Sequence, residues 1–149
     1  MTLRGRGMRD LLRLTLLARH TDASLLLLRW VVGAFLIWGV QDNLLSAERT
    51  AEFEQFLARF GFWQPQWMAP LSVWVQFAVG CGFVLGLCTR WAGLLCAVNF
   101  VVAIVMVDAG GGIRAAFPSA CLVVIGLHLA CNGAGRYALD HGWALRSAG

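Results

Sequence analysis

Residues 71–108 read LSVWVQFAVGCGFVLGLCTRWAGLLCAVNFVVAIVMVD, and this stretch decides the fold. One apolar run extends from Leu71 to Cys88, and a second extends from Trp91 to Val107. Each run is long enough to cross a bilayer as a helix. The residues around the junction, Gly86 to Gly93, make a tight turn. The stretch therefore predicts a transmembrane helical hairpin.

Two further apolar runs, residues 24–41 and 115–132, flank the hairpin and can pack against it. The 149-residue chain is 59% apolar and 13% charged, which leaves too little polar surface to cover a water-soluble globule. In a bilayer each run must be a helix, because only a helix satisfies its own backbone groups there. We therefore predict an all-α integral membrane protein, a four-helix transmembrane bundle in one domain, residues 24–140, with helices at 24–41, 71–88, 91–108 and 115–132.

The segment between the first two predicted helices, residues 42–69, is expected to be external and to contain an amphipathic helix. Apolar residues recur there at helical spacing and share one face: Phe53, Phe56, Leu57 and Phe60. Phe62, Trp63 and Trp67 follow, and aromatic residues of this kind are enriched at membrane interfaces. We interpret them as an anchoring belt in preference to a lid over a ligand.

All 12 basic residues are arginines, and their positions indicate the orientation of the bundle. One group lies before the first helix, in the hairpin turn and after the last helix: Arg4, Arg6, Arg9, Arg13, Arg19, Arg90, Arg136 and Arg146. A smaller group lies in the segments expected on the other side: Arg49, Arg59 and Arg114. By the positive-inside rule both termini are cytoplasmic. Since the net charge of +4 follows membrane topology, we expect no nucleic-acid partner.

The two ends of the chain are expected on the cytoplasmic side. Residues 1–23 fit either a basic arm or a helix lying at the inner interface, and both alternatives stay open. The first apolar run is not read as a cleaved signal peptide, because it is too long and contains Arg29. Residues 141–149 form a cytoplasmic tail in this interpretation.

The cysteines carry no recognisable metal or redox signature. They show no CxxC pair and no histidine-rich spacing, and all fall in predicted helices: Cys81, Cys88, Cys96, Cys121 and Cys131. We expect them to be small apolar packing residues and expect no metal site.

Polar residues within the predicted helices fall into two layers by depth, because the helices alternate in direction. The inner layer contains Arg29, His128, Asn132 and Asp140. The outer layer contains Gln41, Asp42, Gln76 and Asp108. Polar groups at these depths are unfavourable without a structural or functional reason. Each layer is either an interhelical hydrogen-bond clamp or a site for a quinone, a thiol or a proton.

Arg29 lies about 7 Å inside the first helix. It either extends back to the head groups or faces the bundle interior and pairs with a polar group from another helix.

The second helix carries a stripe of small residues four apart, Ala78, Gly82 and Gly86, which Gly80 and Cys81 widen. Such a stripe lets another helix approach closely, within one bundle or between copies in a homo-oligomer.

Two motifs make the chain resemble a known family. Residues 85–92 read LGLCTRWA and are similar to the "LGLxTRxA" hairpin of the DoxX family. Residues 133–140 read GAGRYALD and resemble that family's closing "GxGRYSLD". Leu27-Leu28-Arg29 with Gly33 and Gly39 also fits the family's first helix. The motif positions that match are Gly86, Thr89, Arg90, Gly135, Arg136 and Asp140.

The resemblance implies a four-helix protein of the bacterial inner membrane, and some members are membrane subunits of thiosulfate:quinone oxidoreductase. This chain departs from the family where members commonly have Lys after the first-helix glycine and Glu in the second helix. Asp42 and Gln76 stand there. Because Arg29 and Asp140 both match, we hypothesise that Asp140 folds back to meet Arg29.

Three functions follow from these observations. We favour an accessory subunit of a redox or maturation system, without a complete active site of its own, which contacts the bilayer and a membrane or periplasmic protein. The alternative is a quinone-linked oxidoreductase that binds quinone between helices near Arg29 and His128. A solute carrier is disfavoured, because one four-helix bundle has no room for alternating access.

Overall fold

The computed structural model describes residues 20–140. The expected cytoplasmic tail, and the expected arm as far as residue 19, lie outside these residues. The described chain is entirely helical, and its elements are α3 (Thr21–Leu45), α4 (Ala47–Arg59), α5 (Pro65–Leu85), α6 (Thr89–Met106), the short 3₁₀-helix η1 (Asp108–Gly111) and α7 (Gly112–Asn132). The fold class is the predicted one.

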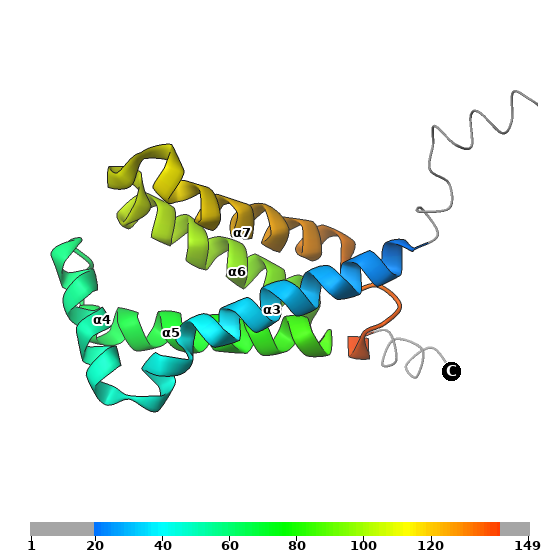
Figure 1. Ribbon diagram of the computed structural model, residues 1–149, viewed down its shortest axis with the longest axis horizontal. Coiled ribbons are helices and arrows are strands. Elements are labelled where there is room, and N and C mark those ends of the chain that lie inside the picture. Colours follow the sequence, from blue (N-terminus) through cyan, green and yellow to red (C-terminus); the bar gives the residue numbers. More distant parts are fainter. Residues whose placement is uncertain (1–19, 141–149) are drawn as a thin grey trace, which may run out of the picture.

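Two helix pairs make up the bundle (Figure 1). α3 crosses α5, and α6 lies alongside α7. One end of the molecule holds the start of α3, the α5–α6 turn and the end of α7. We call it the terminal end. α4 and η1 lie at the other end, which we call the loop end.

Four helices, α3, α5, α6 and α7, are long and apolar enough to cross a membrane. Their lipid-facing surface is rich in large apolar side chains, such as Trp38, Trp74 and Val105. The protein is therefore a multi-pass membrane protein in contact with the bilayer.

The helix boundaries differ from the predicted ones mainly at the start of the second span. α5 begins at Pro65 instead of Leu71, so Pro70 lies inside the helix. Pro65 is at the first helical position, where its missing N–H leaves nothing unpaired. Pro70 removes the bond to the Gln66 carbonyl, and Gln66 is exposed at the loop end, where water can replace that bond.

The α5–α6 turn is set by two left-handed residues. Gly86 ends α5 with φ +67°, and the Leu87 amide donates to the Gly82 carbonyl over 2.9 Å. Cys88 follows with φ +48°, and α6 begins at Thr89. Glycine relieves the strain at the first of these positions, which explains the sharp helix stop.

Each helix pair is held together by a reciprocal glycine contact. A Cβ built on Gly33 would lie 2.8 Å from the Gly80 carbonyl oxygen, and one built on Gly80 would lie 2.9 Å from the Gly33 oxygen. In the second pair, a Cβ on Gly93 would lie 2.4 Å from the Gly126 oxygen, and one on Gly126 would lie 2.7 Å from the Gly93 oxygen. Backbones at such distances leave no room for a side chain.

Two members of the predicted small-residue surface of the second span do approach other helices, Gly80 toward α3 and Gly82 toward Ala92 of α6. Ala78 is exposed, and Gly86 belongs to the turn. The face that approaches another helix centres on Gly80, because α3 supplies Gly33 opposite it.

The predicted external amphipathic helix is present as α4, which lies across the loop end (Figure 1). Ser46 caps it, its hydroxyl accepting from the Arg49 amide at 3.4 Å. Leu57 is buried, whereas Phe56 and Phe60 stay 40% and 39% exposed and pack ring against ring. The helix therefore uses one apolar residue to reach the bundle and keeps aromatic surface outside it.

Candidate functional site

Arg29 is the centre of the terminal end. Its side chain is 1% exposed, so of the two predicted orientations the inward one is observed. Nε donates to the Phe83 carbonyl at 3.1 Å, and one terminal nitrogen donates to the Tyr137 carbonyl at 2.8 Å. The other terminal nitrogen donates to the Ala134 carbonyl. All three guanidinium nitrogens are thus bonded to backbone carbonyls.

These bonds join three segments that are far apart in the sequence. α3 supplies the arginine, the last turn of α5 supplies one carbonyl, and the residues after α7 supply two. Helix ends leave carbonyls without intrahelical partners, and a buried guanidinium can satisfy several at once. Arg29 therefore locks the chain after α7, residues 133–140, which we call the closing strap.

Gly86 makes room for this lock. A Cβ there would lie 3.0 Å from Arg29 Cζ and 2.6 Å from Ala138 Cβ. Gly86, a residue of the family motif, is therefore required both by its left-handed φ and by the close packing around it.

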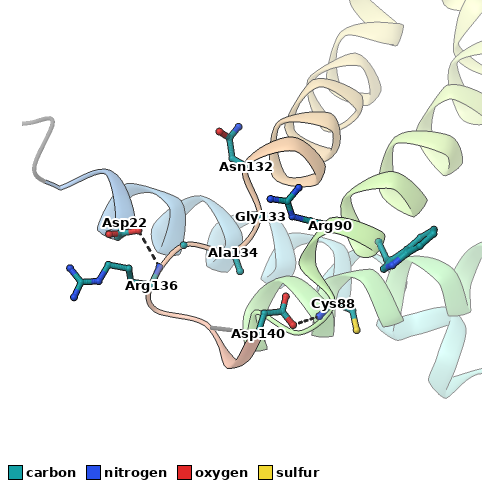
Figure 2. A pocket seen from close by; sticks show the side chains of 10 residues that line it. Asp22, Cys88, Arg90, Asn132, Gly133, Ala134, Arg136 and Asp140 are labelled. Carbon is teal, nitrogen blue, oxygen red and sulfur yellow. Dashed lines mark hydrogen bonds between the residues drawn. The ribbon is translucent and has the colours of Figure 1, made fainter. Parts of the chain in front are cut away.

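Asp140 folds back toward Arg29 and interacts with its charge, as hypothesised, but the two form no ion pair within 4.0 Å. Among residues 20–140, the only ion pair with a nitrogen–oxygen distance within 4.0 Å is Arg49–Glu52. The Asp140 carboxylate instead accepts from the Cys88 amide at 2.7 Å and the Thr89 amide at 2.9 Å (Figure 2). Its own amide donates to the Gly86 carbonyl at 3.0 Å. The N-terminus of α6 attracts the carboxylate, because its unpaired amides carry partial positive charge.

Replacing Asp140 by asparagine is expected to lower the free energy of unfolding by about 1 kcal/mol, the usual contribution of a charged cap at a helix N-terminus. Asparagine keeps one acceptor oxygen but loses the charge. Thermal unfolding in mild detergent measures the loss, and Asp42→Asn at an exposed position is the matched control. An Asp140→Asn protein as stable as the wild type would contradict the capping role.

Asp22 is a second carboxylate that binds the backbone of the strap, and the sequence analysis did not identify it. Its carboxylate accepts from the Arg136 amide at 3.1 Å and so ties the strap to the first turn of α3 (Figure 2). Gly135, with φ +74°, leaves space for it, since a Cβ there would lie 3.1 Å from the carboxylate. The available signal was spacing, because Asp22 precedes Arg29 by two helical turns on the same face.

The other two residues of the predicted inner layer do not bond to Arg29, although Asn132 lines an open cavity at the terminal end together with Asp140. His128 and Asn132 are exposed on α7, and the Asn132 amide donates to the His128 carbonyl at 2.9 Å. The amide also lies 3.3 Å from the His128 ring. The two residues satisfy each other and do not join Arg29, so the predicted four-residue layer is wrong in this respect.

The predicted outer layer is not one cluster either. Asp108 accepts from the Ser119 hydroxyl at 2.5 Å, which ties η1 to α7. Gln76 belongs to a separate group, described next. Asp42 is exposed and Gln41 is half-buried. Neither side chain forms a hydrogen bond with another residue of the described chain.

A polar chain links α5 and α6 near the middle of these two helices. The Gln76 amide donates to the Ser72 hydroxyl at 3.3 Å, and that hydroxyl donates to the Asn99 carbonyl oxygen at 3.1 Å. Asn99 is ten residues into α6, about 15 Å from the terminal end. Ser72 was not predicted. We call these three residues the amide chain.

The remaining motif residues belong to the α5–α6 turn and the strap. Thr89 is fully buried, its hydroxyl has no hydrogen-bond partner among the described residues, and its amide binds Asp140. Arg90 and Arg136 are exposed. The motif positions therefore come together at the terminal end.

No cluster of three or more potential metal ligands occurs between residues 20 and 140. Within that range every cysteine is a free thiol. The hydrogen bonds around Arg29 and Asp140 at the terminal end are those of helix caps and of backbone carbonyls bound by Arg29.

The comparisons with known proteins agree with the motifs. A family model described as DoxX matches residues 24–109, more than half of the chain. No match was found among the curated proteins or among the solved structures. The α5–α6 turn lies inside the matched region, and the strap lies beyond it.

Proposed function

Because the chain belongs to the DoxX family, we propose that it is an accessory subunit of a redox or maturation system in the bacterial inner membrane, where it binds another membrane component. In this proposal the terminal end faces the cytoplasm, as the arginine distribution predicts. The subunit contributes a docking surface and has no complete active site.

The observation that carries the proposal is the amide chain. Ser72 uses its hydroxyl both as donor and as acceptor, but the Asn99 amide nitrogen and the Gln76 carbonyl oxygen have no partner among residues 20–140. Neither atom is fully buried inside the chain. The surrounding hydrocarbon offers no water, so an open donor and an open acceptor there favour a polar partner.

The locks at the terminal end support the same conclusion. The most unfavourable polar group in the membrane, the Arg29 guanidinium, is fully used in binding carbonyls, and Asp140 is used as a cap. Groups committed to structure are not free to bind substrate. Within the described spans, the amide chain keeps an open donor and an open acceptor.

We expect a stoichiometric membrane protein to accompany the chain when it is purified in mild detergent from separated inner membranes. Replacing Asn99 by leucine should reduce its recovery about tenfold, which is the effect of one interhelical hydrogen bond of 1–2 kcal/mol. Quantitative mass spectrometry of the co-purified proteins measures this.

Asn132→Leu is the matched control, because the Asn132 amide is satisfied within its own helix. Recovery of the chain without a partner, or an equal loss in both variants, would contradict the proposal.

The second candidate function is quinone binding. A site between Arg29 and His128 is not formed, since Arg29 is committed to backbone carbonyls and His128 faces outward. The open Asn99 amide instead favours this candidate, because an amide donor can bind a quinone carbonyl oxygen. Quinone that co-purifies with the wild type and is lost from Asn99→Leu would select it over the accessory role.

A further inference from the structure

An open cavity of about 600 Å³ lies at the terminal end, outside the lock around Arg29. It lies between the start of α3, the start of α6 and the strap (Figure 2). Its charged lining residues are Asp22, Arg90, Arg136 and Asp140.

The two carboxylates of the cavity are already bound. Asp140 accepts from two amides at the N-terminus of α6, and Asp22 accepts from the Arg136 amide. The two guanidiniums are not bound in this way. Neither Arg90 nor Arg136 has a carboxylate oxygen within 4.0 Å among the described residues. Arg90 makes one long contact, 3.5 Å to the Ala130 carbonyl.

The backbone leaves the Arg90 guanidinium accessible. Arg90 lies beside Gly133 at the end of α7 (Figure 2). Gly133 has φ +76°, and a Cβ built on it would lie 3.4 Å from Arg90 Nε. Arg136 lies across the cavity from Arg90, next to Asp22, and its guanidinium points away from Arg90 (Figure 2).

The cavity lies at the ends of three apolar spans, α3, α6 and α7, where lipid head groups are expected. α6 begins at Thr89, and Trp91 in its first turn lines the cavity while remaining 71% exposed. Tryptophan beside arginine at the end of an apolar helix is typical of the interface with anionic head groups.

We propose that this cavity binds a phosphate-bearing ligand, with Arg90 as the anchor and Arg136 as the second positive charge at its mouth. A guanidinium presents paired N–H donors that match phosphate oxygens, and these charged bonds are stronger than neutral ones. The phosphate belongs either to a lipid head group or to a soluble molecule. The proposal does not depend on the accessory function, because it uses no residue of the amide chain.

The test uses the full chain in mild detergent with three probes: phosphatidylglycerol, diacylglycerol of the same acyl chains, and inorganic phosphate at matched ionic strength. Native mass spectrometry measures lipid retention, and thermal unfolding measures stabilisation by phosphate. The variants are Arg90→Gln and Arg136→Gln. Arg114→Gln, an exposed arginine at the loop end, is the matched control.

We expect Arg90→Gln to weaken binding about tenfold, the effect of one charged hydrogen bond, and Arg114→Gln to leave it unchanged. Retention of phosphatidylglycerol but not diacylglycerol identifies a lipid head group. Stabilisation by inorganic phosphate without lipid retention identifies a soluble phosphate.

The proposal is overturned if diacylglycerol binds as well as phosphatidylglycerol without phosphate stabilisation, if all variants bind equally, or if no probe binds. Should Arg90→Gln fail to fold, Arg136→Gln decides the result, because the Arg136 guanidinium is not part of any lock in the described chain.

Discussion

Replacing Arg29 by methionine is expected to lower the free energy of unfolding by about 3–5 kcal/mol, the largest single effect we predict. Methionine keeps much of the apolar stem but removes three donors. The carbonyls of Phe83, Ala134 and Tyr137 would then lose their partner, two of these bonds being buried and one partly buried. The strap should loosen, because within the described chain only the bonds made by Asp22 and Asp140 would still hold it.

Unfolding of the purified protein in mild detergent, by heat or by added SDS, measures this loss. Limited proteolysis after Gly133 reports detachment of the strap independently of global stability. Arg49→Met is the matched control, since the Arg49–Glu52 pair is exposed and such pairs contribute less than about 1 kcal/mol. An Arg29→Met protein with wild-type stability and an uncut strap would show that the lock is dispensable.

Replacing Gly93 by alanine is expected to cost about 2–3 kcal/mol, although only one methyl group is added. The new Cβ would lie 2.4 Å from the Gly126 oxygen and 2.8 Å from the Ala130 amide nitrogen. Both neighbours are backbone atoms, which cannot rotate away. The α6–α7 pair must therefore separate, and its other contacts weaken with it.

Gly39→Ala is the matched control, because a Cβ on Gly39 would meet nothing within 4 Å. Both glycines lie inside helices, where alanine is intrinsically favoured. Gly39→Ala should be neutral or stabilising by up to about 1 kcal/mol. Equal melting temperatures for Gly93→Ala and Gly39→Ala would contradict the close crossing.

Folding tests of these variants are also informative for function. Gly93 and Arg29 belong neither to the amide chain nor to the cavity at the terminal end. Substituting them should therefore lower stability before it lowers partner recovery or phosphate binding. Arg90→Gln should show the opposite order, whereas Asn99→Leu also removes the bond from Ser72 that links α5 to α6. This difference separates residues that hold the bundle from residues proposed to act outside it.

Sequence patterns predicted the elements well, because each depends on a property that is local in the chain. A long apolar run must be a helix in a bilayer, and the four runs gave four spans. The amphipathic spacing around Leu57 predicted α4 for the same kind of reason. Errors were confined to helix ends, as at the start of α5, where water at the exposed Gln66 carbonyl permits Pro70 inside the helix.

Partner assignments were less successful, because they depend on which helix faces which. Depth alone grouped His128 with Arg29, yet rotation of α7 about its axis puts His128 on the outside. Charge alone paired Asp140 with Arg29, yet the amides of Cys88 and Thr89 are closer to that carboxylate. Asp22 and Ser72 passed unnoticed, since neither belongs to a motif.

The sequence by itself determined the membrane location, the helical fold and the positions of the turn and the strap, because hydropathy and glycine act within a few residues. Only the tertiary structure decided that Arg29 binds carbonyls, that Gly33 meets Gly80, and that the amide chain keeps an open donor and acceptor. Those facts depend on how each helix is rotated against its neighbours. That rotation is set by close packing summed over the whole bundle, which no local pattern records.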